Sequence, residues 1–117
     1  MLKNSLTYAI YKRARISPKK VVPVLDLIRG RGLYDAKVIL ATDPTKAAKM
    51  ILKTLKSAEA NAKNNLEIGL DDLFVHETWV SSGRTAKSGR FVGRGNFSPI
   101  LKRTSHIYVG LNERAKK

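Results

Sequence analysis

The 117-residue sequence contains no cysteine, which excludes a disulfide framework and a zinc site built from thiolates. It has only two histidines, His76 and His106, so a histidine-rich metal site is not expected. The longest apolar runs are far too short to cross a bilayer, and the basic N-terminal segment lacks the apolar core of a secretory signal. These absences predict one compact domain over residues 1–117, with no metal, no cofactor and no membrane insertion.

Acidic residues are scarce as well, and none occurs between Glu77 and Glu113. The sequence has 9 Asp plus Glu against 23 Lys plus Arg, which gives a formal net charge of +14. Because 43% of the residues are hydrophobic, the chain is expected to fold despite this charge. The excess costs self-repulsion in the folded state, so a polyanionic partner is expected. Nucleic acid is the first candidate; an anionic membrane is weaker, since no strongly apolar helix face is left over.

Hydrophobic spacing at helical period predicts three helices, at residues 17–30, 33–41 and 43–65. Ser17 and Asp43 are each followed by proline, so we expect them to cap the first and third helices. Pro23 removes an interior hydrogen bond, which predicts a kink or a loose first turn in the first helix. The third helix has the clearest apolar stripe, made of Ala48, Ile51, Leu52, Leu55, Ala58 and Ala62.

Alternating side chains predict three strands, at residues 7–13, 73–80 and 106–111. In the second strand, Leu73 and Val75 are expected to share one face with Trp79. The third strand alternates most clearly, with Ile107, Val109 and Leu111 on one side and His106, Tyr108 and Gly110 on the other.

Residues 81–98, which join the last two strands, are rich in Gly, Ser and Arg. About eighteen residues is long for a structureless loop, so a floppy linker competes with an extended β-hairpin. Hairpin arms would reach about 30 Å and would be marginal alone in water, so they need an external partner. The positive charges favour RNA over a merely solvated loop, and Phe91 and Phe97 are available to stack on bases.

A second cluster of positive charge surrounds the start of the first helix, where five cations fall within nine residues: Lys12, Arg13, Arg15, Lys19 and Lys20. Because a helix N-terminus favours anions, we expect phosphate contact there. The lysines of the third helix are as consistent with a solvated face as with RNA contact.

No catalytic constellation is evident. His76 beside Glu77 and His106 beside Ser105 are strand neighbours whose side chains point to opposite faces. The run 89–95 lacks the Gly-Lys-Ser/Thr ending of a phosphate-binding loop, and no helix pattern follows it. An enzyme is therefore not expected. The two alternatives are a structural RNA-binding protein and a free-standing nucleic-acid chaperone or regulator.

Four strings carry a resemblance: Arg15-Ile-Ser-Pro-Lys-Lys20, Asp26-Leu-Ile-Arg-Gly30, Leu55-Lys-Ser-Ala-Glu-Ala-Asn-Ala62 and Leu101-Lys-Arg-Thr-Ser-His-Ile107. In this order and spacing, the sequence closely resembles the bacterial or organellar family of large-subunit ribosomal proteins conventionally numbered twenty-two, over residues 8–111. The resemblance implies an α+β fold, with three helices packed on a three-stranded antiparallel sheet and a long protruding β-hairpin at residues 83–99. It implies no catalysis.

The resemblance also implies a structural constituent of the large ribosomal subunit that binds rRNA, supports subunit assembly and lines the nascent-peptide exit tunnel. Its partners would be large-subunit rRNA, neighbouring ribosomal proteins and the nascent polypeptide, on ribosomes of the cytoplasm or of an organelle matrix or stroma. Charge and resemblance together give the rRNA-binding candidates: Lys12, Arg13, Arg15, Ser17, Lys19, Lys20, Arg84, Lys87, Arg90, Arg94, Lys102, Arg103 and Thr104. The tunnel-lining hairpin tip is expected at Lys87, Ser88, Gly89, Arg90, Phe91 and Val92.

One segment departs from the family pattern. The stretch Phe91-Val-Gly-Arg-Gly-Asn-Phe97 stands where Pro-Arg-Ala-x-Gly-Arg-Ala is usual, and Ser88 and Gly89 replace an arginine and an apolar residue. The contacts of the tip are therefore expected to differ from those usual in the family.

Overall fold

The computed structural model describes residues 6–66 and 73–113. Its central element is a three-stranded antiparallel sheet of order β1-β5-β2, formed by β1 (Thr7–Ala14), β2 (Leu73–Ser82) and β5 (Ser105–Glu113). The helices are α1 (Pro18–Ile28), α2 (Leu33–Thr42) and α3 (Lys46–Asn61), which continues into a π-helical turn, Ala62–Leu66. A separate two-stranded hairpin is formed by β3 (Ala86–Val92) and β4 (Asn96–Lys102). The α+β fold expected from the sequence is confirmed.

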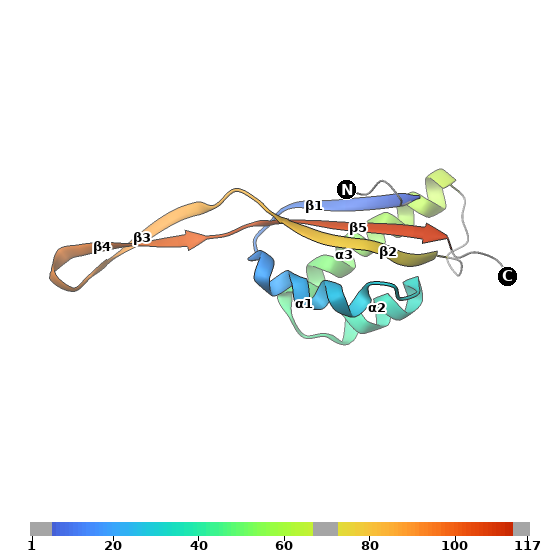
Figure 1. Ribbon diagram of the computed structural model, residues 1–117, viewed down its shortest axis with the longest axis horizontal. Helices are drawn as coiled ribbons and strands as arrows, with labels where there is room; N and C mark the ends of the chain where they lie inside the picture. The colour runs from blue at the N-terminus through green and yellow to red at the C-terminus, as the bar shows by residue number, and fades with distance from the viewer. Residues whose placement is uncertain (1–5, 67–72, 114–117) are drawn as a thin grey trace.

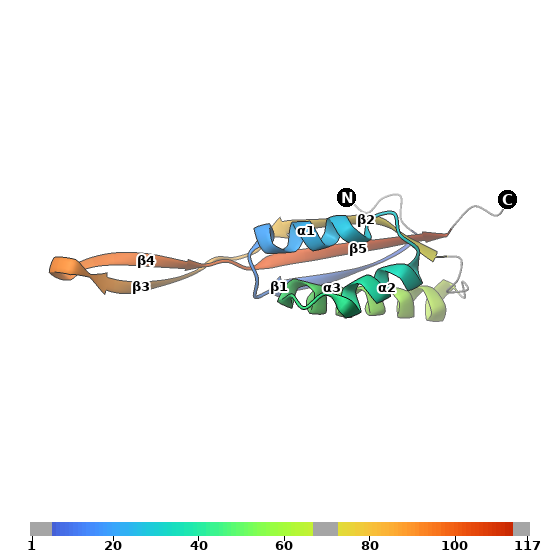
Figure 2. The ribbon, with the colours of Figure 1, turned by 90° about the horizontal axis from the view of Figure 1, so that it is seen from below.

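The three helices cover one face of the sheet, and the hairpin extends away from the end of the sheet at which β2 ends and β5 begins (Figures 1 and 2). The molecule is correspondingly long, with principal extents of 69 × 27 × 20 Å. In the part of the chain that is described, no helix is long and apolar enough to span a membrane. The same residues contain no group of His, Asp and Glu side chains arranged to hold a metal ion.

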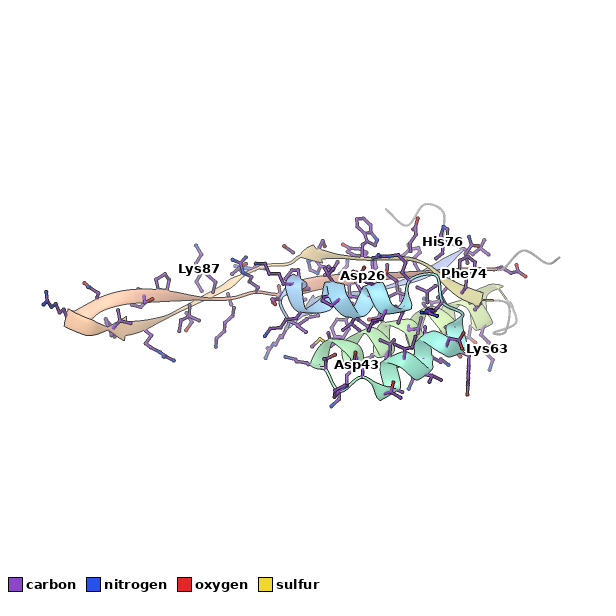
Figure 3. All side chains as sticks on the ribbon, turned by 60° about the horizontal axis from the view of Figure 1, so that its bottom comes forward. Asp26, Asp43, Lys63, Phe74, His76 and Lys87 are labelled. Atoms are coloured by element: carbon purple, nitrogen blue, oxygen red, sulfur yellow. The ribbon has the colours of Figure 1, made fainter. Side chains whose placement is uncertain are left out.

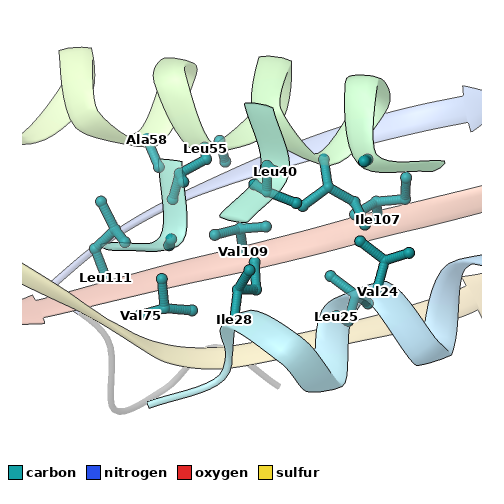
Figure 4. Close-up of a cluster of buried hydrophobic side chains, with 14 of the residues drawn as sticks. Val24, Leu25, Ile28, Leu40, Leu55, Ala58, Val75, Ile107, Val109 and Leu111 are labelled. Atoms are coloured by element: carbon teal, nitrogen blue, oxygen red, sulfur yellow. The ribbon is translucent and has the colours of Figure 1, made fainter. Parts of the chain in front are cut away.

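The hydrophobic core lies between the sheet and the helices (Figure 4). On β5, Ile107, Val109 and Leu111 are fully buried, as their alternation predicted. Leu25 of α1 and Leu55 of α3 meet them from the helical layer (Figure 4). The stripe predicted for α3 is buried except at Leu52, which packs against the core only partly. Full burial of one aliphatic side chain contributes about 1.5–3 kcal/mol, so this layer holds the body together.

Helix starts follow the predicted positions only in part. Ser17 is the N-cap of α1, but its side chain makes no capping hydrogen bond. The expected cap at Asp43 is wrong: Thr45 caps α3, and its hydroxyl accepts a 3.3 Å hydrogen bond from the backbone N–H of Ala48. Asp43 instead accepts a 2.9 Å hydrogen bond from the N–H of Thr45. Hydrogen bonds from the Thr45 backbone and side chain lower the pKa of the Asp43 carboxyl.

Pro23 lies inside α1, which continues past it to Ile28. The proline is exposed, while its neighbours Val21 and Val24 are buried against the core. Because proline has no backbone N–H, the carbonyl of Lys19 lacks the hydrogen bond that it would otherwise accept from residue 23. Packing of the buried face therefore maintains the helix where local propensity opposes it.

The predicted face of Trp79 is wrong, because β2 contains a bulge. Val75 pairs with Leu111 and Glu77 with Gly110, so His76 is an extra residue that reverses the alternation beyond it. Thr78 is consequently the buried residue, and Trp79 lies on the opposite face, beside Tyr108.

The hairpin turn lies farther along the chain than predicted. Val92 pairs with Asn96, and the turn is a short 3-10 helix at Gly93–Gly95, with Arg94 at φ 60° and Gly95 at φ 74°. The expected tip, residues 87–92, is instead most of the outgoing strand β3. The paired residues of the hairpin run from 86 to 102, beside the expected hairpin segment of 83–99.

We predict that the body folds without the hairpin, because no hairpin residue is buried. Replacing residues 86–102 by an Asn-Gly turn should change the free energy of unfolding by less than about 1 kcal/mol. Urea denaturation followed by circular dichroism measures this. The comparison variant is Ile107→Ala, which creates a core cavity and should cost about 2–5 kcal/mol. A hairpin deletion as damaging as Ile107→Ala would show that the body depends on the hairpin.

Candidate RNA interface

Two backbone-anchored hydrogen bonds hold the neck, residues 83–85 and 103–104, where the hairpin joins the body. The N–H of Gly83 donates to the carbonyl of Thr104 at 2.9 Å, and the Thr104 hydroxyl donates to the carbonyl of Arg84 at 2.6 Å. A Cβ added at Gly83 would lie 2.5 Å from Thr104 Oγ1, so this close approach requires glycine. The neck therefore fixes the direction in which the hairpin leaves the sheet.

A bulge near the end of β1 determines where Lys12 and Arg13 lie. Tyr11 pairs with Ile107 and Ala14 with Ser105, so both basic residues stand opposite the single residue His106. Arg13 adopts φ 58°, a left-handed conformation that costs a non-glycine residue about 1–2 kcal/mol. Its N–H donates to Nδ1 of His106 at 3.1 Å, which offsets part of this strain. The bulge interrupts the regular pairing near the end of β1 and thereby places the two cations Lys12 and Arg13 at the neck.

A surface hollow of about 600 Å³, called the first hollow, lies beside this bulge. Its lining combines the bulge, the neck and the start of β5: Lys12, Arg13, Arg84, Thr85, Ala86, Thr104 and His106. No acidic residue lines it. Because Nδ1 of His106 accepts a hydrogen bond, the neutral ring carries its proton on Nε2, which leaves a donor for a partner.

The second hollow, of about 710 Å³, lies at the start of α1. It is lined by Arg15, Ile16, Ser17, Pro18, Lys19, Lys20, Ser82, Leu101 and Arg103, again without an acidic residue. The buried hydroxyl of Ser105 donates to the carbonyl of Ile16 at 2.5 Å, which ties this turn to β5. Backbone N–H groups at a helix start and four nearby cations make this hollow suited to phosphate oxygens.

The cations of the neck and the hairpin have no acidic residue near them in the sequence, since none occurs between Glu77 and Glu113. The ion pairs Arg29–Asp26 and Lys37–Glu59 both lie outside the candidate set. Figure 3 places the acids Asp26 and Asp43 in the helical layer and Lys87 on the hairpin. Cations without acidic neighbours attract a polyanion instead of neutralising one another.

Comparison with known proteins identifies the family. Residues 9–112 match the model described as Ribosomal protein L22p/L17e. The chain belongs to this family. It is 49% identical over 107 residues to a large ribosomal subunit protein uL22 from Clostridium beijerinckii, covering 92% of this chain and 96% of the relative. It is 45% identical over 114 residues to the uL22 protein of Streptococcus pyogenes serotype M6, covering 97% and 100%. The resemblance drawn from the sequence is confirmed.

All of the candidate residues lie within the matched range of the L22p/L17e family. The two hollows bring together nine of them, those from the N-terminal cluster and from the neck: Lys12, Arg13, Arg84 and Thr104 in the first, and Arg15, Ser17, Lys19, Lys20 and Arg103 in the second. The other four, Lys87, Arg90, Arg94 and Lys102, lie along the hairpin outside both hollows. The structure thus separates the candidates into a neck group and a hairpin group.

The candidate set expected from the sequence contains neither His106 nor Gly83. His106 is brought there by the β1 bulge, which the alternating pattern of side chains does not reveal. Gly83 acts through the space it leaves for Thr104 and for the His106 ring, whose Cε1 and Nε2 would each lie 3.3 Å from an added Cβ. The available signal was the position of Gly83 at the end of a strand, where close backbone approach is common.

We predict that the effect of backbone strain at Arg13 on stability can be separated from the effect of its charge on RNA binding. Arg13→Gly should be about 1 kcal/mol more stable than Arg13→Ala, because glycine tolerates φ 58° and alanine does not. Both variants lose the same charge, so both should weaken RNA binding to the same extent. Thermal unfolding and a filter-binding titration measure the two effects. Equal stability of the two variants would show that this residue is not left-handed in solution.

Proposed function

We propose that this protein is a structural constituent of the large ribosomal subunit that binds rRNA at its neck. The observation that carries the proposal is the pair of acid-free hollows on either side of the hairpin base, lined by cations from β1, α1 and the neck. The large ribosomal subunit is inferred from the family to which the chain belongs and from the names of its relatives. The role is positional: the protein holds RNA segments relative to one another and performs no reaction.

Phosphate contacts suit this role because they position RNA without reading its sequence. The two hollows hold cations that come from segments far apart in the chain, so one RNA fold can engage them only when the body is folded. Double-helical RNA presents phosphates and 2′-hydroxyl groups rather than readable base edges, and a fixed spacing of cations recognises that shape. In this way the body supports subunit assembly by joining RNA segments that meet at the neck.

The hairpin is proposed to pass between RNA segments and to line the nascent-peptide exit tunnel with its end. It is exposed along its length, with Phe91 77% and Phe97 61% exposed, so it buries little of its own surface. A two-stranded ribbon of this kind is marginal in water and gains most from a partner that surrounds it. The residues nearest the Gly93–Gly95 turn, which include Phe91, Val92 and Arg94, would face the tunnel and the nascent polypeptide.

Salt dependence tests the neck as the RNA-binding site. The triple variant Lys19→Ala, Lys20→Ala, Arg103→Ala should reduce the slope of log affinity against log salt by about 2–3, since each phosphate contact contributes about 0.7–0.9. The matched control removes three exposed lysines elsewhere: Lys49→Ala, Lys56→Ala, Lys63→Ala. It should change the slope far less. If the two triples were equivalent, net charge rather than the neck would govern binding.

Cosedimentation tests the assignment to the subunit. The protein should remain with large subunits at about one copy each after a high-salt wash, because many phosphate contacts and the threaded hairpin release slowly together. Quantitative mass spectrometry of the pelleted subunits measures the ratio. Release of the protein in the wash, with RNA binding retained in isolation, would favour a free-standing nucleic-acid chaperone.

A further inference from the structure

The sheet has a second face, which the described helices leave uncovered (Figures 1 and 2). Tyr108 lies between the buried residues Ile107 and Val109, so its side chain is on this uncovered face. It pairs with Ile10 of β1 on one side and with Trp79 of β2 on the other. Directly paired residues share a face, so Ile10, Tyr108 and Trp79 form a row across the sheet.

This row presents aromatic surface in a fixed geometry. The rings of Trp79 and Tyr108 have centroids 4.8 Å apart and planes inclined by 34°. The Ser81 hydroxyl donates a 3.4 Å hydrogen bond to the Tyr108 hydroxyl and so helps to orient that ring. Tyr8, one pleat away on β1, is 51% exposed. The aromatic face is the name used for Tyr8 together with the row Ile10, Tyr108 and Trp79.

The two ends of the aromatic face differ in charge. At the hairpin end, His106 occupies the outward position of β5 next to Tyr108. It lines the first hollow together with Lys12 and Arg13. At the other end Glu77 pairs with Gly110, which also pairs with Tyr8. Phosphate is therefore attracted to the hairpin end, and the carboxylate disfavours phosphate at the far end.

We propose that the aromatic face stacks unpaired bases of RNA whose adjoining phosphates occupy the first hollow. The inference rests on the proposed RNA-binding function and adds a second kind of contact to it. Two observations favour RNA over a protein partner: the aromatic face is continuous with a cationic hollow, and that hollow has no acidic lining residue. An aromatic ring on an open sheet accepts any base, because every base has a π-face.

The sequence contains a single tryptophan, Trp79, so its fluorescence reports this face directly. The test titrates the full chain with a single-stranded RNA oligonucleotide and with an abasic strand of the same length. Filter binding measures each affinity independently. We expect both strands to bind but only the RNA with bases to quench Trp79. Equal quenching by the two strands, or binding of RNA without quenching, would overturn the inference while leaving phosphate binding intact. If neither strand bound, the proposed function itself would fail.

Variants separate stacking from charge. Tyr108→Val should weaken the affinity for the base-containing strand about five- to a hundred-fold, the range expected for loss of one stacked base. The affinity for the abasic strand should not change. Tyr34→Val is the matched control, because Tyr34 is 77% exposed on α2, away from the sheet. Tyr8→Val removes a half-exposed ring and serves as a second test if Tyr108→Val does not fold.

A protein occupant of this face would give a different result. Trp79 fluorescence would then change on addition of RNA-free large-subunit proteins, and Tyr108→Val would leave the affinity for both strands unaltered. That combination would assign the face to a protein and overturn the inference. Unchanged fluorescence with those proteins, together with base-dependent quenching, supports it.

Discussion

The register of β5 is the constraint on which the rest of the structure depends. This strand pairs with β1 on one side and β2 on the other, and its inward residues form the centre of the core. A slip of one residue would expose Ile107, Val109 and Leu111 together, so the register is strongly specified. The first residues of the strand also organise the interface: Ser105 holds the turn before α1 and His106 holds the bulge of β1. The hydrophobic core therefore determines where the cations of the neck lie.

The alternation of β5 was predictable from the sequence, because a strand with one buried face must repeat every two residues. The bulges at Arg13 and His76 were not, because an extra residue changes pairing without changing composition. The cap of α3 was misplaced because Asp43 and Thr45 are both good capping residues, and the competition between them is decided by local geometry. The hairpin turn was placed too early because its position was carried over from the family resemblance. Glycines at 89, 93 and 95 each permit a turn, and strand pairing selects among them.

The candidate site was predictable as two charged segments but not as two hollows. Clusters of cations near residues 12–20 and 102–104 are visible in the sequence, and their meeting depends on the antiparallel pairing of β1 with β5. Placing them together costs electrostatic repulsion that the body must withstand. The fully buried core supplies that stability, and it also offsets the conformational cost of the left-handed backbone at Arg13.

Gly89 and Phe97 fit together across the two strands of the hairpin. The ring of Phe97 lies over Gly89, and a Cβ added there would be 1.7 Å from the ring's Cζ, so a larger residue at position 89 would displace the ring. Phe97 also meets Phe91 edge to face, with ring centroids 5.8 Å apart. The ring of Phe97 on β4 therefore fills the space that the absent side chain of Gly89 leaves on β3. Local contacts of this kind set the shape of the hairpin, while the neck sets its direction. Because the neck fixes how the hairpin is attached, an RNA partner has to order the ribbon itself but not its attachment to the body.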